Sequence, residues 1–333
     1  MKKNRLSVKD IAELAGTSVA TVSRVINQNG RFSKETEQRV KSIMEEYGYQ
    51  PNQLARGLRV SRTQVIGILV PDLMNEFFAS IVKEVQKTLL EKKYMTLICS
   101  TNENVMEAQD QIRMLLGQKV DGIIYIGGDD IVESIHIPIV FIDRDPRDNH
   151  PGIEDYALFE CDNIQGGYLA GCELAEKGAK NIAYVCFNTE FSTTKKRLMG
   201  FEKALKENNI ELPLDCGVHV EEVSIEAGRT ATEYIINHMK NVDGIFFMSD
   251  ILAIGGLEYV NSVGIKVPEQ MKIVGFDDIS FGRITTPKLT TIHQPVDRMG
   301  QAAANCIMDM IEGNEIDVKR QRIPVSLVVR ATT

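Results

Sequence analysis

Apolar residues near the start of the chain recur at the spacing of two short helices. Ser7 and Ser18 stand where N-caps are expected, each followed three residues later by Asp10 or Thr21, and Gly16 permits a sharp turn between the helices. This pattern predicts a helix-turn-helix, whose second helix would lie in the major groove of DNA. An ordinary helical hairpin is the alternative. The apolar positions that would face each other are Val8, Ile11, Ala12, Ala15, Val22, Val25 and Ile26.

Two further helical patterns follow before the linker. A third helix is capped by Ser33 and ends at Gly48. The segment Pro51–Arg59 is a potential helix of about two turns, which is marginal alone because helix nucleation is costly at that length. Residues 61–63 then have the composition of a linker.

From Thr63 onward, short apolar runs alternate with amphipathic helical stretches. Such alternation predicts parallel sheets covered by helices on both faces, and its two repeats predict two doubly wound subdomains. Ligands of such sheets bind at the carboxyl ends of the strands, in the cleft between two subdomains. The expected strands are Val65–Val70, Tyr94–Cys99, Gly122–Ile126, Ile137–Ile142, Ile182–Phe187, Val218–Val223, Gly244–Met248 and Lys272–Phe276.

Composition places the chain among ordinary globular proteins of about two to three domains, at 333 residues, 43% hydrophobic and 25% charged. No apolar run reaches the ~18 residues of a membrane helix, and the basic N-terminus lacks the apolar stretch of a signal peptide. The six cysteines show no Cys-x-x-Cys spacing. They are therefore expected to be buried thiols in a reducing cytoplasm and not a disulfide or zinc framework.

Charge is distributed unevenly along the chain. Residues 1–62 hold 12 Lys and Arg against 6 Asp and Glu, a net +6, whereas the other residues hold 26 against 40, a net −14. A basic head on an acidic body is typical of a protein that binds nucleic acid. A solvated basic face would explain the charge but not its coincidence with the helix-turn-helix.

Nine short motifs follow one another along essentially the whole chain. They are residues 8–12 (VKDIA), 21–27 (TVSRVIN), 49–58 (YQPN…AR…L), 66–72 (IGI…PD), 141–144 (FIDR), 162–163 (DN), 197–201 (R…GF), 275–278 (GFDD) and 289–295 (LTTI…QP). In these motifs the chain resembles the lactose/galactose repressor family of bacterial transcription regulators. Its pair Val19-Ala20 is more similar to galactose- and ribose-type repressors than to the lactose type.

The resemblance implies an all-α helix-turn-helix head followed by an α/β core like the periplasmic sugar-binding proteins. The head would span residues 1–50, a hinge helix and linker 51–62, and the effector-binding and dimerisation core 63–333. Within the core, the N-subdomain would comprise about 63–161 and 293–323, and the C-subdomain about 162–291 and 324–333. The chain would cross between the subdomains near Cys161–Asn163, Thr290–Gln294 and Ile323–Ser326.

Carried onto this head, the resemblance implies that Val19, Ala20 and Arg24 enter the major groove, where Arg24 can donate two hydrogen bonds to guanine. Thr17, Ser18, Thr21 and Asn27 are better placed for phosphates, although capping alone would explain the serine and threonines.

In the hinge, Leu58 matches the leucine that family members insert into the minor groove from paired hinge helices, with Leu54 and Ala55 beside it. Packing within a linker is the alternative role for Leu58.

In the cleft, the loop after the first strand supplies Phe77 and Phe78, aromatic faces that suit a sugar ring. The family usually has Pro where this chain has Glu76. Carboxylates and guanidinium groups can hold vicinal hydroxyls, but Asp143, Arg144 and Asp250 could equally serve as caps or core hydrogen-bond partners. The rest of the predicted wall is Phe191, Thr193, Arg197, Ser249 and Asp277.

The function expected from these features is a sequence-specific, DNA-binding repressor of a carbohydrate-utilisation operon, controlled by a sugar or sugar phosphate in the cleft. Its expected partners are operator DNA and a second copy of the chain, with a tetramer left open. No cofactor, metal or membrane is expected to bind. A regulator whose co-effector is a phosphorylated carrier protein is the alternative. A doubly wound enzyme is disfavoured because the chain has no Gly-x-Gly-x-x-Gly, Walker or Gly-x-Ser-x-Gly motif.

Overall fold

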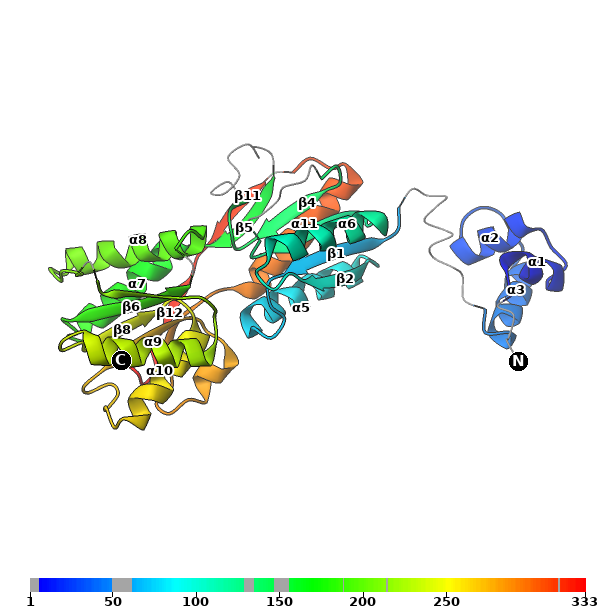
Figure 1. Cartoon of the computed structure of the whole chain (residues 1–333). Helices are drawn as coiled ribbons and strands as arrows, with labels where there is room; N and C mark the ends of the chain where they lie inside the picture. Colours follow the sequence, from blue (N-terminus) through cyan, green and yellow to red (C-terminus); the bar gives the residue numbers. More distant parts are fainter. Residues whose placement is uncertain are drawn as a thin grey trace. The chain divides into compact units, whose positions relative to one another are not determined.

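A computed structural model describes residues 6–49, 62–128, 135–146, 156–187, 189–213, 215–316 and 318–333. The chain divides into two compact units, Met1–Thr63 and Gln64–Thr333 (Figure 1). The expected hinge helix, including Leu54, Ala55 and Leu58, lies outside the described residues.

The first unit contains a helix-turn-helix, as the apolar spacing predicts. Its described helices are α1 (Val8–Leu14), α2 (Val19–Asn27) and α3 (Lys34–Glu46). The predicted capping box is present, since Ser7 Oγ accepts from Asp10 N and Asp10 Oδ2 accepts from Ser7 N. Gly16 adopts φ +60°, a value that glycine reaches without strain. The three helices pack around Ile11, Ala12, Ala15, Val22, Val25 and Val40.

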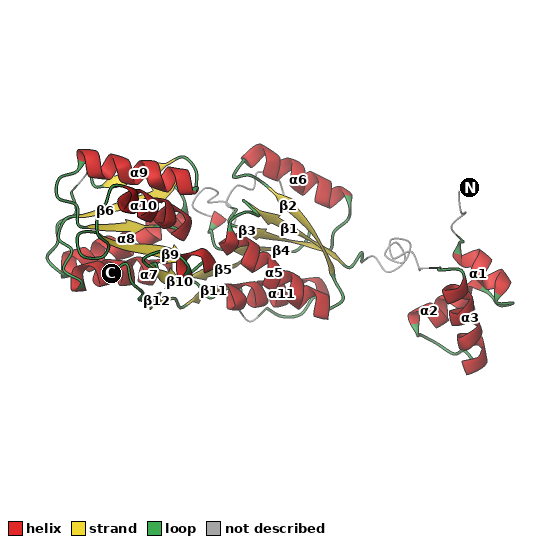
Figure 2. Cartoon of the chain, turned by 90° about the horizontal axis from the view of Figure 1, so that it is seen from below, coloured by secondary structure: helices red, strands yellow, loops and turns green. Residues whose placement is uncertain are grey.

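The second unit contains two sheets, which Figures 1 and 2 show as two layered subdomains. The described strands of the first sheet are β1 (Val65–Val70), β2 (Met95–Ser100), β3 (Gly122–Ile126), β4 (Ile139–Ile142), β5 (Ala157–Cys161) and β11 (Arg320–Ile323). They are all parallel and follow the order β11-β5-β4-β3-β1-β2.

Helices cover both faces of this first sheet. Alternate residues of the apolar strand β1 point to opposite faces, so that Ile66 and Ile68 pack toward α5 (Glu76–Glu91) and α11 (Val296–Glu312), while Leu69 packs toward α6 (Val105–Gly117). This burial on both faces explains why the strand is a continuous apolar run in the sequence.

The second sheet repeats the arrangement. Its described strands are β6 (Ile182–Phe187), β7 (Gly217–Val220), β8 (Gly244–Phe247), β9 (Lys272–Asp277), β10 (Thr290–His293) and β12 (Ser326–Val328), in the order β12-β10-β9-β8-β6-β7. One face packs against α7 (Asn163–Glu176) and α8 (Ser192–Glu207), and the other against α9 (Ile225–His238) and α10 (Asp250–Ser262) (Figure 2). The expected parallel sheets are confirmed, with one antiparallel pair at an edge, where β12 runs antiparallel to β10.

The chain passes between the two sheets three times. It leaves the first sheet between β5 and α7, returns between β10 and α11, and leaves again between β11 and β12. These are the places where the family resemblance implies the crossings. The elements β5, β10, β11, β12 and α11 that flank them are absent from the expected strands and helices.

Two further features of the described residues bear on the class of protein. All six cysteines carry free thiols. In the ranges that the structure describes, no helix has the length and apolar character needed to cross a membrane.

Candidate functional site

A cavity of about 440 Å3 lies between the two subdomains of the core. Its walls come from the segments that follow β1, β2 and β4 in the first sheet and β6, β7 and β8 in the second, together with the last residue of β9. Because these are the carboxyl ends of parallel strands, loops from both sheets converge on one cleft. The volume suits a small organic ligand.

Nine of the ten residues predicted for this site line the cavity. They are Phe77, Phe78, Asp143, Arg144, Phe191, Thr193, Arg197, Ser249 and Asp277.

The tenth predicted residue, Asp250, does not line the cavity. It is fully buried, and its carboxylate accepts hydrogen bonds from Thr291 Oγ1 at 2.5 Å and from the backbone N–H of Ile279 at 3.0 Å. Burial, followed by the nearby Asp277 carboxylate, raises the pKa of Asp250 well above its ordinary value. Asp250 therefore links the start of α10 to the segment after β9 and to strand β10, which is the structural role left open for it.

Asp143 and Arg144 are presented to the cavity by a tight turn. The N–H of Arg144 donates to the carbonyl of Ile142 across Asp143, whose φ is +82°. This γ-turn geometry is rare and strained for a residue with a side chain, and such strain concentrates at functional sites.

Asp143 is only 3% exposed, and its carboxylate oxygen Oδ1 has no hydrogen-bond partner. Burial raises the pKa of Asp143, and the neighbouring Arg197 and Arg144 guanidinium groups oppose that rise. A buried acceptor without a donor costs free energy, so a bound molecule that donates a hydrogen bond to this atom would be favoured.

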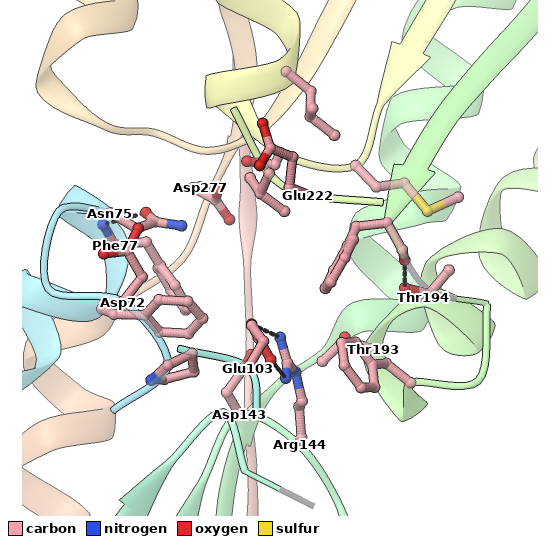
Figure 3. A pocket seen from close by; sticks show the side chains of 18 of the residues that line it. Asp72, Asn75, Phe77, Glu103, Asp143, Arg144, Thr193, Thr194, Glu222 and Asp277 are labelled. Atoms are coloured by element: carbon pink, nitrogen blue, oxygen red, sulfur yellow. Dashed lines mark hydrogen bonds and ion pairs between the residues drawn. The ribbon is translucent and has the colours of Figure 1, made fainter. Parts of the chain in front are cut away.

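Arg144 joins the two sides of the cleft. Its NH1 and NH2 donate to the two carboxylate oxygens of Glu103 at 2.7 and 2.9 Å, and its guanidinium carbon lies 3.7 Å from the centre of the Phe191 ring (Figure 3). Glu103 belongs to the first subdomain and Phe191 to the second. A guanidinium that is paired and stacked in this way is held in one orientation.

Arg197 is held equally firmly within the second subdomain. Its Nε donates to Asn163 Oδ1 at 2.8 Å, its NH1 donates to the Met248 carbonyl at 2.6 Å, and its guanidinium carbon lies 3.7 Å from the centre of the Phe276 ring. Part of its role is therefore structural, although it also lines the cavity.

Asp277 ends β9 with φ +122°, a backbone conformation unusual for aspartate. Its Oδ1 accepts a hydrogen bond from Gln294 Nε2 at 2.7 Å. Burial raises the pKa of Asp277 to about 7, against the opposing effect of Arg197.

Aromatic rings face the cavity from both subdomains. Phe77 and Phe78 lie in the first turn of α5, with ring centres 5.2 Å apart, and Phe187 and Phe191 precede α8, with ring centres 5.5 Å apart. In Figure 3, Phe77 and Asp72 lie on one side of the cavity and Thr193 lies on the other. Rings on opposite walls can contact both faces of a small ligand.

Several lining residues were not among the predicted site residues. Polar residues directly after a strand were the available signal, since Asn102 and Glu103 follow β2 and Glu221 and Glu222 follow β7. The lining residues outside the prediction are Pro71, Asp72, Asn75, Asn102, Glu103, Phe187, Thr194, Glu221, Glu222, Val223, Ser224, Met248 and Leu252.

In the head, α2 presents Ala20 and Arg24 to solvent, as DNA contact requires. Val19 is only half-buried and packs partly against the head core. Ser18 caps α2 by accepting from Thr21 N at 3.1 Å, and the two hydroxyls lie 2.9 Å apart. Thr17 is half-buried before the cap, and the side chain of Asn27 is outside the described residues.

Among the side chains that the structure describes, no group of three or more His, Cys, Asp or Glu could hold a metal ion. A helix-turn-helix head on a two-subdomain core with a ligand-sized cleft defines a class of DNA-binding regulators that respond to small molecules.

Comparisons with known proteins agree with this class. Residues 7–52 match the family described as bacterial regulatory proteins, lacI family, and residues 172–333 match a periplasmic binding protein-like domain. The chain is 31% identical to the ribose operon repressor of Halalkalibacterium halodurans, over 98% of this chain and 97% of that protein. It is 32% identical to the HTH-type transcriptional repressor PurR of Edwardsiella ictaluri, over 97% and 96%.

A solved structure supports the same assignment. The lac repressor dimer bound to operator and the anti-inducer ONPF superposes with a TM-score of 0.88 at 26% identity, covering 99% of each chain. The chain belongs to the lacI family of bacterial regulatory proteins, and it is a DNA-binding transcription regulator with a ligand-binding core.

Proposed function

We propose that this protein represses a carbohydrate-utilisation operon and that a sugar bound in the cleft changes its affinity for operator DNA. The observation that carries the proposal is the buried Asp143 Oδ1, which has no donor and lines a cavity between aromatic rings. A sugar hydroxyl would supply the missing donor while the apolar face of the sugar packs on phenylalanine. The relative named as a ribose operon repressor supports a carbohydrate effector.

We propose that Arg24 reads a guanine in each half-site and that Val19 and Ala20 contact thymine methyl groups. Thr17, Ser18, Thr21 and Asn27 would bind phosphates and fix the register of α2 on the duplex. Ser18 can do this while it caps α2, and Thr21 while its hydroxyl contacts that of Ser18, since each hydroxyl retains acceptor or donor capacity.

We propose further that two chains bind one pseudo-palindromic operator. A single head on each chain would recognise one half-site, and a two-fold protein recognises a two-fold site. The hinge residues Leu54, Ala55 and Leu58 would enter the minor groove between the half-sites. Operator binding would place the protein in the cytoplasm with the chromosome.

This function is carried out by binding and not by catalysis. The named relatives are transcriptional repressors. If the sugar couples to the operator, linkage requires that each change the affinity of the other by the same factor.

The experiment begins by selecting an operator from a random DNA pool with the purified protein. Titrating sugars into the complex, with fluorescence anisotropy of the DNA as readout, should change operator affinity. Asp143→Asn should retain operator affinity and lose the response. If no sugar has an effect but a phosphorylated carrier protein does, the effector assignment is wrong. Recovery of a chemically altered sugar would contradict the absence of catalysis.

A further inference from the structure

The charged side chains that line the cavity are mostly acidic. Among the described lining residues there are two guanidinium groups, those of Arg144 and Arg197. The carboxylates of the same lining are those of Asp72, Glu103, Asp143, Glu221, Glu222 and Asp277. The exposed carboxylates of Asp72, Glu221 and Glu222 repel anions and attract hydrogen-bond donors and cations, whereas burial favours the neutral forms of Asp143 and Asp277.

Neither guanidinium is arranged as an anion receptor. Arg144 already makes a bidentate ion pair with Glu103, the geometry in which arginine would otherwise hold a phosphate or carboxylate. Arg197 directs its Nε to Asn163 and its NH1 to the Met248 carbonyl. Both rest on phenylalanine rings, which fixes them in these positions.

A buried acceptor of the lining has the same preference. When ionised, Asp143 Oδ1 is a hydrogen-bond acceptor, and a hydroxyl or amino group can donate to it whereas an ionised phosphate oxygen cannot. Glu221 and Glu222 are exposed and lie on the wall formed after β7. An anionic group would meet these carboxylates as it entered.

We infer that the effector is a polyhydroxylated molecule without an anionic group, either an uncharged sugar or an amino sugar, and that phosphorylated sugars are excluded. This inference rests on the proposed function and narrows its ligand class. The common chemistry is a set of hydroxyl or amino donors on a small ring, directed to Asp143 and Asp277.

The first turn of α8 is a feature of the cavity wall that favours an anionic ligand. It has no side-chain cap and no acidic residue, so its backbone N–H groups are available to an acceptor. A sugar hydroxyl oxygen can also accept these hydrogen bonds, but a phosphate accepts them more strongly because it is charged. The measurement must therefore compare matched ligands that differ only in charge.

The experiment measures ligand binding to the full-length protein in the absence of DNA. Ribose is compared with ribose 5-phosphate, and glucose with glucosamine and glucose 6-phosphate, by thermal shift and then calorimetry. We expect at least one uncharged or amino member to stabilise the protein and its phosphorylated partner to bind about tenfold more weakly or worse. Tighter binding of a phosphorylated member, or stabilisation by none of the unphosphorylated ones, would overturn the inference.

A substitution that removes one carboxylate tests why phosphorylated sugars are excluded. Glu103→Gln leaves Arg144 without its counter-charge, so inorganic phosphate should bind this variant about tenfold more tightly than the wild type, the scale of one hydrogen bond to a charged group. Glu91→Gln is the matched control, because Glu91 is an exposed carboxylate at the far end of α5. Equal phosphate affinity in all three proteins would contradict the role assigned to Glu103.

The ligand class and the regulatory role can fail independently in these experiments. A sugar that binds with the expected charge preference but leaves operator affinity unchanged would refute the regulatory role and keep the ligand class. A phosphorylated sugar that binds tightly and alters operator affinity would keep the regulatory role and refute the ligand class.

Discussion

Glu76 and Ser280 join the two subdomains of the core beside the cavity. Glu76 Oε1 accepts from the backbone N–H of Ser280 at 2.9 Å, and Glu76 Oε2 accepts from its hydroxyl at 2.8 Å. Glu76 is the first residue of α5, whereas Ser280 starts a short 3-10 helix (Ser280–Arg283) after β9. Both hydrogen bonds require the subdomains to keep their present separation.

Replacing Glu76 with alanine should weaken ligand binding. Each hydrogen bond contributes about 0.5–1.5 kcal/mol and the pair is exposed, so we expect an effect near the lower end, about 1 kcal/mol or fivefold in affinity. The ligand then has to bring together subdomains that no longer hold each other. Calorimetry with the tightest sugar from the matched series measures the change.

Glu91→Ala supplies the control for this loss of a carboxylate, because Glu91 lies in the same helix but is exposed at its other end. If Glu76→Ala and Glu91→Ala bind the sugar equally well, the contact between Glu76 and Ser280 has no part in closing the cleft.

The close crossing of α7 and α8 depends on two glycines. A Cβ on Gly200 would lie 1.9 Å from the Ile164 carbonyl oxygen, and one on Gly167 would lie 1.9 Å from that of Arg197. Gly200→Ala should therefore separate the helices and lower the free energy of unfolding by about 1–3 kcal/mol. Urea denaturation measures this directly.

Gly117→Ala is the matched substitution, since Gly117 is helical and a Cβ there meets nothing within 4 Å. It should leave stability unchanged or raise it by up to about 1 kcal/mol. Equal effects of the two substitutions would mean that helix propensity, and not the crossing, controls the result.

The sequence predicts best the elements whose burial is uniform. β1 and β3 are apolar at every position because both of their faces are covered. β5 has the same buried environment but carries Glu160, which is 7% exposed and pairs with Lys196 at 2.5 Å. The buried charge of Glu160, which is paired with a residue far along the chain, interrupts the apolar pattern. For this reason β5 is not predicted from the sequence.

The site shows the same limit. Asp277 was predictable because it ends a strand in a family motif, and Phe77 because it is an aromatic residue in the segment that follows the first strand. The pairing of Glu103 with Arg144 joins residues 41 apart and becomes visible only when both are placed in three dimensions. Asp250 illustrates the converse, because its position after β8 suggests a ligand contact whereas its carboxylate serves Thr291 and Ile279.

In the head, Arg24→Ala should weaken binding to the selected operator by about 1–3 kcal/mol and relax the preference at one base pair of each half-site. Its guanidinium is exposed on α2, as a contact to a base edge requires. Arg31→Ala should instead weaken all DNA sequences alike and reduce the salt dependence of binding. Binding to a library of operator variants measures both effects. If Arg24→Ala kept the same base-pair preference as the wild type, Arg24 on α2 would not be the residue that reads the base.

Stability should fall as the pH rises, because of Asp277. Its pKa rises from 3.8 to about 7 in the folded protein through burial, so the folded state binds more protons than the unfolded state between these values. The free energy of unfolding then decreases as pH increases across this window, by on the order of a few kcal/mol for a shift of this size.

Asp277→Asn has no proton to lose, so it should flatten the decline between pH 5 and pH 8 and be more stable than the wild type at pH 8. Asp215→Asn, at an exposed position, should keep the wild-type profile. Urea denaturation at four pH values decides the matter, and a decline as steep in Asp277→Asn as in the wild type would assign the pH dependence to other buried carboxyls, such as Asp250.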